Sequence, residues 1–263
     1  MRLRQSLKVF LLPLFAAAGC KTTPKVAEVN GQCADVYHGH VCTWARMQGK
    51  TVLAVGVSVP VTAIDSAPAE AGPMAWPPAA AAVLQLPESA QAQSGLTHFT
   101  MYWEAQGHPP TPYMVPHFDF HFYAIPPSER AAITCADQSK PAALPAGYAL
   151  PDFPLPPDMA KMIGVPVLVG ICVPQMGMHS LPAAEFQSTT PFRGSMVVGY
   201  YSGKPIFVEP MLSRAMLEEK KSFDFPIPAI PGQAGAHPTT FHGEYDAQQG
   251  VYRFVFSGFQ AGS

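Results

Sequence analysis

The clearest alternation of polar and hydrophobic residues in this chain lies between Pro116 and Tyr123. Successive side chains of a β-strand point to opposite faces, so the alternation predicts a strand rather than a helix. One face would carry Phe118, Phe120 and Phe122. The other face would present His117, Asp119, His121 and Tyr123. We therefore expect a hydrophobic core on one side of this strand and a polar pocket or solvent on the other.

Runs of alternating or β-branched residues elsewhere, separated by turn residues, predict further antiparallel strands. Hairpins are expected within residues 40–59, 195–209 and 239–256, with single strands at 96–104 and 165–173. The last run is almost continuously apolar, which predicts a strand buried on both faces. Short helices are expected at residues 79–86 and 212–221 and after Pro127. The pattern predicts a β-rich α+β fold of antiparallel sheets and hairpins, in a sandwich or open barrel, with a few short helices.

The composition is consistent with one large domain and excludes one class of partner. Of the 263 residues 48% are hydrophobic, enough for a substantial core, and 30 are prolines, which favour short elements and extended loops. Charged residues make up only 13%, and the formal net charge is -2. Proteins that bind nucleic acid carry a basic face, so we expect no nucleic-acid partner. We assign residues 31–258 to a single β-rich domain, followed by a C-terminal tail at 259–263.

Residues 1–19 resemble the signal peptide of a bacterial lipoprotein. A basic start precedes an apolar run, and Ala17-Ala18-Gly19 stand directly before Cys20. The run is too short to span a bilayer in the mature protein, and small residues before a cysteine are typical of lipoprotein cleavage. We predict that Cys20 becomes the lipidated first residue, that residues 20–30 form a polar tether, and that the protein is anchored to a membrane in the periplasm or at the cell surface. An ordinary secretory signal with an incidental cysteine is the alternative.

The other four cysteines would then lie in an oxidising compartment, where an even number favours disulfides. We expect Cys33 to pair with Cys42, because they are close in sequence. We expect Cys135 to pair with Cys172, because the first follows a short helix and the second ends an apolar strand. A zinc site is the competing interpretation, but the chain contains no Cys-x-x-Cys pair. His40 has no carboxylate at a suitable spacing, so we interpret it as a solvated loop residue.

The polar face of the predicted 117–123 strand indicates a metal centre. Imidazoles and carboxylates that converge from separate strands are common ligands of divalent metals. At ~3.3 Å per residue, His117 and His121 would lie ~13 Å apart, too far for joint chelation in a straight strand. We expect one divalent ion, zinc, iron or manganese, with ligands drawn from His117, Asp119, His121, His179 and Glu209. Asp119 would either bind the ion or orient an imidazole.

Two further pocket residues and one alternative complete this interpretation. His108 precedes the strand and Tyr123 ends it, so both are expected to line the pocket, and Tyr123 is more simply a core residue. The alternative to a metal centre is a buried hydrogen-bond network in which Asp119 bridges two histidines and stabilises the sheet.

Several segments of the chain resemble an uncharacterised family of bacterial exported domains, the TTHB-two-ten-like family. The segments, in order, are Gly107-His108-Pro109-Pro110, Pro116 to Tyr123, Ser128 to Ile133, Met176-Gly177-Met178-His179, Gly199 to Gly203 and Phe207 to Met211. The resemblance covers residues 31–258 and implies an exported, single-domain, β-rich α+β fold that self-associates. The family has no known reaction. The matching positions are His108, His117, Asp119, His121, His179 and Glu209. Ser180-Leu181-Pro182 and Arg193-Gly194 depart from the family pattern.

Three functions follow from these observations. The first is a lipid-anchored envelope protein whose histidine and carboxylate pocket binds a divalent metal or a small polar ligand. The second is a metal-dependent hydrolase or oxygenase in which Glu209 or Asp119 acts as a general base. The third is a structural envelope protein that self-associates through its weakly charged surface and has no catalytic role.

Overall fold

The computed structural model describes residues 24–70, 72 and 75–261. The predicted signal peptide and Cys20 lie outside the described residues. Strand β1 (Val26–Val36) begins inside the stretch predicted as a tether, because its backbone pairs with β2 from Val26 onward. At the other end, Gln260 forms a β-bridge with His237, so part of the predicted tail is attached to the domain.

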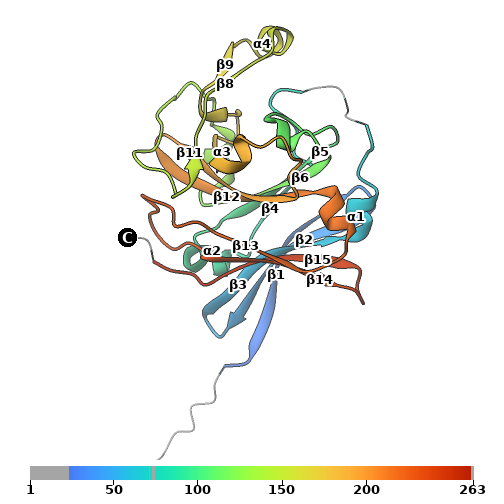
Figure 1. Ribbon diagram of the computed structural model, residues 1–263. Helices are drawn as coiled ribbons and strands as arrows, with labels where there is room; N and C mark the ends of the chain where they lie inside the picture. The colour runs from blue at the N-terminus through green and yellow to red at the C-terminus, as the bar shows by residue number, and fades with distance from the viewer. Residues whose placement is uncertain (1–23, 71, 73–74, 262–263) are drawn as a thin grey trace, which may run out of the picture.

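One layer of the molecule is a six-stranded antiparallel sheet (Figure 1). Its strands, in spatial order, are β1, β2 (Gly39–Gln48), β3 (Thr51–Pro60), β15 (Val251–Ser257), β14 (Thr240–Asp246) and β13 (Phe223–Pro226). The hairpins predicted near residues 40–59 and 239–256 are β2–β3 and β14–β15, and the structure confirms both. The two hairpins pair with each other through β3 and β15, so they form the centre of this sheet.

The second layer is a seven-stranded sheet. Its order is β4 (Ala82–Gln85), β5 (His98–Glu104), β6 (His117–Tyr123), β12 (Lys204–Ser213), β11 (Gly194–Tyr201), β10 (Met178–Pro182) and β7 (Tyr148–Ala149). The predicted hairpin at 195–209 is β11–β12. The alternating strand of the sequence is β6, which lies between β5 and β12 and is buried along its whole length.

The main core fills the space between the two sheets, which confirms the predicted β-rich sandwich. Phe118, Phe120 and Phe122 project from β6 into this core. Phe120 packs against Phe254 with ring centroids 4.8 Å apart. Phe122 packs against Phe256 with ring centroids 4.6 Å apart, and both Phe254 and Phe256 belong to β15. The hydrophobic face of β6 therefore joins the two sheets, and its polar face points away from them.

The connecting segments cover that polar face (Figure 1). They contain the short elements η1 (Thr111–Tyr113), α3 (Pro127–Ala131), η2 (Val169–Ile171) and α5 (Ala183–Phe186). Two smaller clusters of buried hydrophobic residues pack between these segments and the second sheet. The remaining helices are α1 (Val61–Asp65), α2 (Glu88–Ser94) and α6 (Arg214–Glu218). A separate arm made of β8 (Phe153–Pro154), α4 (Pro157–Ile163) and β9 (Val167–Leu168) projects from the molecule.

Some sequence predictions of secondary structure are wrong. The stretch at 79–86 is not a helix, since residues Ala82–Gln85 form β4 and pair with β5, with alternate residues buried. The apolar run at 165–173 is not a long buried strand. Its only strand is Val167–Leu168, and Gly170 and Ile171 then adopt positive φ angles that turn the chain into the next segment. The helix predicted at 212–221 is shorter, because β12 continues to Ser213, whose hydroxyl caps α6.

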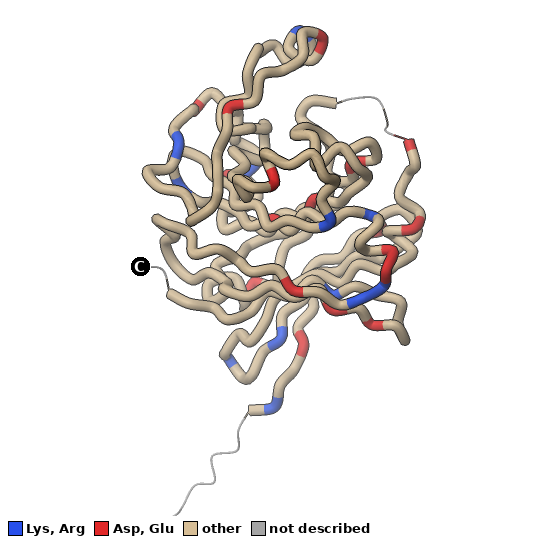
Figure 2. Tube along the Cα trace, viewed as in Figure 1, with Lys and Arg blue, Asp and Glu red and all other residues tan. Residues whose placement is uncertain are grey.

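Both predicted disulfides are present. Cys33–Cys42 joins neighbouring strands β1 and β2. Cys135–Cys172 ties the segment after α3 to the segment after η2. Among the described residues no helix is long and apolar enough to cross a membrane. Lysines, arginines and acidic residues are sparse along the described chain, and both signs are interspersed (Figure 2).

Candidate metal centre

The polar face of the second sheet is built by cross-strand pairs of β5 and β6. The register pairs His98 with Tyr123, Thr100 with His121, Tyr102 with Asp119 and Glu104 with His117. Paired residues on neighbouring strands project to the same side of a sheet. Eight polar or aromatic side chains therefore form one continuous surface beneath the covering segments. Apart from Glu104, all of these residues are buried. Asp119 is 6% exposed, and the other six are at most 2% exposed.

The first of two histidine and carboxylate groups is centred on Asp119, and we call it the Asp119 group. His117 Nε2 lies 3.2 Å from Asp119 Oδ1, and both residues project from β6. His108 Nε2, from the loop after β5, lies 3.6 Å from Asp119 Oδ2. Each carboxylate oxygen of Asp119 thus faces a different imidazole. His117 is fully buried, whereas 37% of the His108 side chain is exposed, so this group reaches solvent through His108.

The second group is centred on Glu209 of β12, and we call it the Glu209 group. His121 Nε2 of β6 lies 3.6 Å from Glu209 Oε2. His179 Nε2 of β10 lies 4.0 Å from the same oxygen. His121 and Glu209 are buried, and His179 is 12% exposed. Three strands of the second sheet therefore supply this group.

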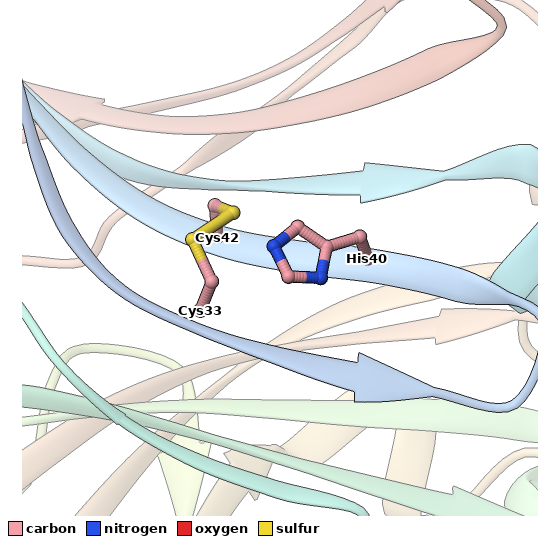
Figure 3. A group of neighbouring side chains, drawn as sticks. All are labelled: Cys33, His40 and Cys42. Atoms are coloured by element: carbon pink, nitrogen blue, oxygen red, sulfur yellow. A yellow bond between two sulfur atoms is a disulfide. The ribbon is translucent and has the colours of Figure 1, made fainter.

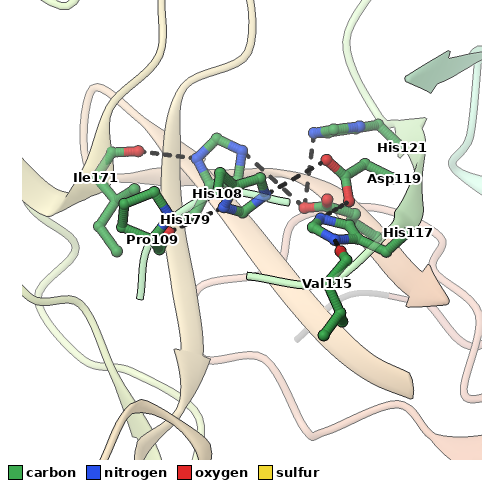
Figure 4. Close-up of polar contacts among 9 residues, drawn as sticks. His108, Pro109, Val115, His117, Asp119, His121, Ile171 and His179 are labelled. Carbon is green, nitrogen blue, oxygen red and sulfur yellow. Dashed lines mark hydrogen bonds and ion pairs between the residues drawn. The ribbon is translucent and has the colours of Figure 1, made fainter. Parts of the chain in front are cut away.

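Hydrogen bonds to backbone carbonyls fix the orientation of three of the four imidazoles (Figure 4). The Nδ1 atom of His108 lies 2.9 Å from Pro109 O, that of His117 lies 2.7 Å from Val115 O, and that of His179 lies 2.9 Å from Ile171 O. A carbonyl can only accept, so Nδ1 carries the hydrogen in each ring. In the neutral ring, Nε2 then has a lone pair and no hydrogen. The same arrangement orients histidines that bind metals in proteins.

Several polar atoms at the middle of the two groups have no hydrogen-bond partner among the described residues. They are His117 Nε2, Asp119 Oδ1, both ring nitrogens of His121, and Glu209 Oε2. A buried polar atom without a partner costs about 1–3 kcal/mol. These atoms nevertheless face one another, with lone pairs directed at carboxylate oxygens. A proton or a metal ion between them removes this repulsion.

The spacing of the donor atoms fits a divalent cation. In each group the three donor atoms lie within 4.8 Å of one another. Ligand atoms bound at ~2.1 Å to a tetrahedral or octahedral ion are roughly 3.0–3.4 Å apart. The Asp119 group, at 3.2 and 3.6 Å, is close to this range. The Glu209 group, at 3.6 and 4.0 Å, is wider than this range, so both imidazoles would move toward a bound ion.

Burial and charge set the protonation of these side chains in opposite directions. Burial alone raises the pKa of the Asp119 carboxyl, but the charges of His117 and His108 outweigh it and hold that pKa well below its usual range. Burial, followed by the charge of Asp119, raises the pKa of Glu209 well above its usual range. Burial lowers the pKa of His121, and it lowers the pKa of His179 to about 4. Without a metal, Glu209 therefore holds a proton beside neutral imidazoles, and an incoming cation displaces that proton.

His108 titrates in the other direction. Burial lowers the pKa of His108, but its hydrogen bond with Asp119 and the charge of that carboxylate outweigh burial and raise the pKa overall. More than a third of the ring is exposed, so solvent screens part of this interaction. His108 and Asp119 therefore form an ion pair when no metal is bound.

The structure groups the predicted residues differently from the sequence prediction. It brings together all the expected ligands, but in two groups of three rather than as one ion with a mixed set. His108 belongs to the Asp119 group itself. His117 and His121 fall into different groups, as their separation along a straight strand predicts. Asp119 faces His108 and His117 and does not bridge His117 to His121.

Tyr123 contributes packing at the edge of the centre. Its ring stacks between His98, at 4.7 Å, and His121, at 5.6 Å, and its hydroxyl has no partner among the described residues. The hydroxyl therefore makes no hydrogen bond to Asp119 or Glu209.

Sequence reasoning missed four neighbours of the centre: His98, Tyr102, Glu104 and Arg130. Arg130 is buried and donates to Gln175 O at 3.0 Å, and its guanidinium lies 5.8 Å from the Tyr123 ring. Residues 98, 100, 102 and 104 alternate with apolar residues as residues 117–123 do. That alternation was the available signal for a second polar strand face.

A third group of potential ligands is not a metal site. Cys33, Cys42 and His40 lie close together, but the two cysteines form a disulfide (Figure 3). His40 Nδ1 instead lies 2.7 Å from Asp35 Oδ1 at the surface. The prediction that His40 is solvated is confirmed, since 63% of its side chain is exposed, but the residue lies in strand β2 and not in a loop.

No protein-family model, no curated protein and no solved structure matches the chain. The resemblance to the TTHB-two-ten-like family therefore stays a prediction.

Proposed function

We propose that this chain is an exported, lipid-anchored protein of the bacterial envelope whose buried histidine and carboxylate centre binds a divalent transition metal. The observation that carries the proposal is the orientation of the imidazoles. Three of them donate Nδ1–H to backbone carbonyls and direct Nε2 toward a carboxylate oxygen. Zinc, iron and manganese all accept two histidines and one carboxylate.

The competing explanation is a hydrogen-bond network held together by protons. Such a network explains the pair of His108 and Asp119, where an imidazolium faces a carboxylate. It leaves His121 unexplained, because neither ring nitrogen of this buried residue has a hydrogen-bond partner among the described residues. A cation bound to His121, His179 and Glu209 satisfies the ring and the carboxylate together, so metal binding accounts for more of the site.

Export is supported by the two disulfides and by the pattern of residues 1–20. Disulfides persist in oxidising compartments, and small residues before Cys20 are typical of lipoprotein signals. The anchor lies outside the described residues and rests on the sequence alone.

A catalytic role is the second candidate. Each group provides three protein ligands, which leaves open coordination positions on the ion. The partly exposed rings of His108 and His179 are the sides from which water can reach those positions. A metal-bound hydroxide there would suit hydrolysis, and iron there would suit oxygen chemistry.

The test of metal binding uses protein purified without an affinity tag. We expect elemental analysis to find tightly bound zinc, iron or manganese in the wild-type protein. The double variant His108→Ala/His179→Ala should bind the same metal more than about 100-fold more weakly, since loss of supporting contacts alone costs 10–100-fold. These two residues are the partly exposed members of the centre, so their loss should leave the core intact.

The matched control is His40→Ala/His242→Ala, which removes two exposed histidines that pair with surface aspartates. This control should retain full metal content. Wild-type protein that binds no metal after incubation with each ion, or a double variant that binds as well as wild type, would contradict the proposal and favour the proton-linked network.

A further inference from the structure

We infer that the centre holds two divalent ions at once, one in the Asp119 group and one in the Glu209 group. This inference rests on the proposed function and extends it from one ion to a pair. It begins from the completeness of each group. The Asp119 group and the Glu209 group each contain two imidazoles and one carboxylate, and no residue is shared between them.

A single ion cannot use both groups. His117 and His121 are four positions apart on the same strand, so their attachment points are separated by ~13 Å. β6 pairs with β5 at every position from His117 to Tyr123, which keeps this stretch extended. Each carboxylate is also committed, because Asp119 faces only the first pair of histidines and Glu209 only the second pair.

The two groups are nevertheless neighbours. Asp119 and His121 are two positions apart on one face of β6, a separation of ~6–7 Å. Glu209 lies on the adjacent strand β12, between Val208, which pairs with Phe122, and Met211, which pairs with Asp119. The four imidazoles approach a common region from three segments, since His117 and His121 both lie on β6. His108 and His179 come from the same side (Figure 4). The ions would therefore occupy adjacent positions along the β6–β12 pair.

Both groups contain buried atoms that have no hydrogen-bond partner in the part of the chain that the structure describes. In the Asp119 group they are His117 Nε2 and Asp119 Oδ1, and in the Glu209 group they are the His121 nitrogens and Glu209 Oε2. His117, His121 and Glu209 are each no more than 2% exposed. One ion in either group would provide a partner for the buried atoms of that group only. The buried polar atoms of the other group would remain unpaired, at the usual cost in desolvation free energy. Two ions satisfy both.

The net charge around the two metal ions predicts that they would also bind an anion. Two divalent ions bring more positive charge than the carboxylates of Asp119 and Glu209 neutralise. Glu104 lies opposite His117 on β5, beside the Asp119 group, and adds a third carboxylate there. Arg130 lies on the side of His121 and adds positive charge near the Glu209 group. The remaining positive charge favours a small oxygen anion, such as hydroxide, between the ions, as in other two-metal sites.

The experiment counts ions in matched single variants. Tag-free protein would be stripped with chelator, titrated with Co²⁺ or Mn²⁺, and analysed for bound metal after removal of free ion. We expect two ions per wild-type chain and one ion in His108→Ala or in His179→Ala. The exposed control His242→Ala should retain two. Circular dichroism of each variant checks that it is folded.

Electron paramagnetic resonance of the Mn²⁺ forms provides the second measurement. The wild-type spectrum should show magnetic coupling between neighbouring ions, and each single variant should give the spectrum of an isolated ion. One ion per wild-type chain, retained in His108→Ala, would overturn the second ion and leave metal binding at the Glu209 group standing. No ion in any form would overturn the proposed function itself. Two ions without magnetic coupling would overturn the claim that they are neighbours.

Discussion

One hydrogen bond orients each of three histidines of the centre: His108, His117 and His179. Where Nδ1 donates to a carbonyl, as in His117 and His179, Nε2 is left free to bind a cation. The sequence predicted which residues meet here, because His and carboxylate residues alternate with phenylalanine in the strand 117–123. It could not predict the partners of Nδ1, because Val115 O and Ile171 O belong to connecting segments whose course depends on the whole fold.

His98 illustrates a buried histidine outside the two groups. It is fully buried, and its ring stacks on Tyr123. Burial, assisted by the charge of Arg130, lowers its pKa to about 4. In the unfolded chain the pKa is about 6.5, so between these values the unfolded state binds the proton and the folded state does not. His98 therefore contributes stability that is complete above pH ~6.5 and is lost as the pH falls toward 4.

We predict that the free energy of unfolding of the metal-free protein declines as the pH is lowered from about 6.5 to about 4. His98→Phe keeps an aromatic ring against Tyr123 and cannot take up the proton. Its decline should be shallower than that of wild type by up to about 1.4 kcal/mol per pH unit. Urea unfolding at a series of pH values in the presence of chelator measures both slopes, and identical slopes would contradict this assignment.

The segment from η2 to β10 links a disulfide to the proposed metal centre. Ile171, whose carbonyl accepts the hydrogen bond of His179, directly precedes Cys172, which is bonded to Cys135. Arg130 of α3 holds the same segment through Gln175 O. The sequence predicted the disulfide but not this function for it, because the apolar run 165–173 suggested a strand. Glycine and positive φ angles at Gly170 and Ile171 turn the chain instead.

We predict that Cys135→Ser/Cys172→Ser lowers both stability and metal affinity. Loss of a disulfide typically costs about 2–4 kcal/mol, and release of Ile171 would loosen His179 in addition. Losing a group that orients a ligand weakens metal binding by about 10–100-fold. Thermal unfolding and metal titration measure the two effects. Cys33→Ser/Cys42→Ser is the control, because it removes a disulfide between β1 and β2, distant in the fold from His179, and should leave metal affinity unchanged. Equal losses of affinity in both pairs would contradict the link.

The molecule as a whole combines a sandwich that the sequence largely predicted with a covering layer that it did not. Hairpins β2–β3, β11–β12 and β14–β15 follow from alternation and from turn residues between paired strands, which are local signals. The division of ligands into two groups depends on how the loop bearing His108 and the segment bearing His179 cross the second sheet. Contacts between residues far apart in sequence decide that course, and local pattern does not report them.

The lipid anchor predicted at Cys20 would attach the protein to a membrane. We expect the wild-type protein, expressed in a bacterium with its full N-terminus, to fractionate with membranes, and Cys20→Ala to be released in soluble form. Metabolic labelling with a fatty-acid analogue should mark the wild type and not the variant. Cys33→Ser is the control for loss of a cysteine and should remain membrane-attached. Membrane attachment of Cys20→Ala would contradict the anchor.

Alternate residues of strand β6 are under two different evolutionary constraints. Its phenylalanines must fit the packing between the sheets, whereas its histidines and Asp119 need only suit the covering segments and whatever they bind. A substitution at one class of position leaves the other face unaltered. The architecture can therefore persist while the ligand set diverges, and in distant relatives the three phenylalanine positions should stay apolar even where the metal-binding residues have been exchanged.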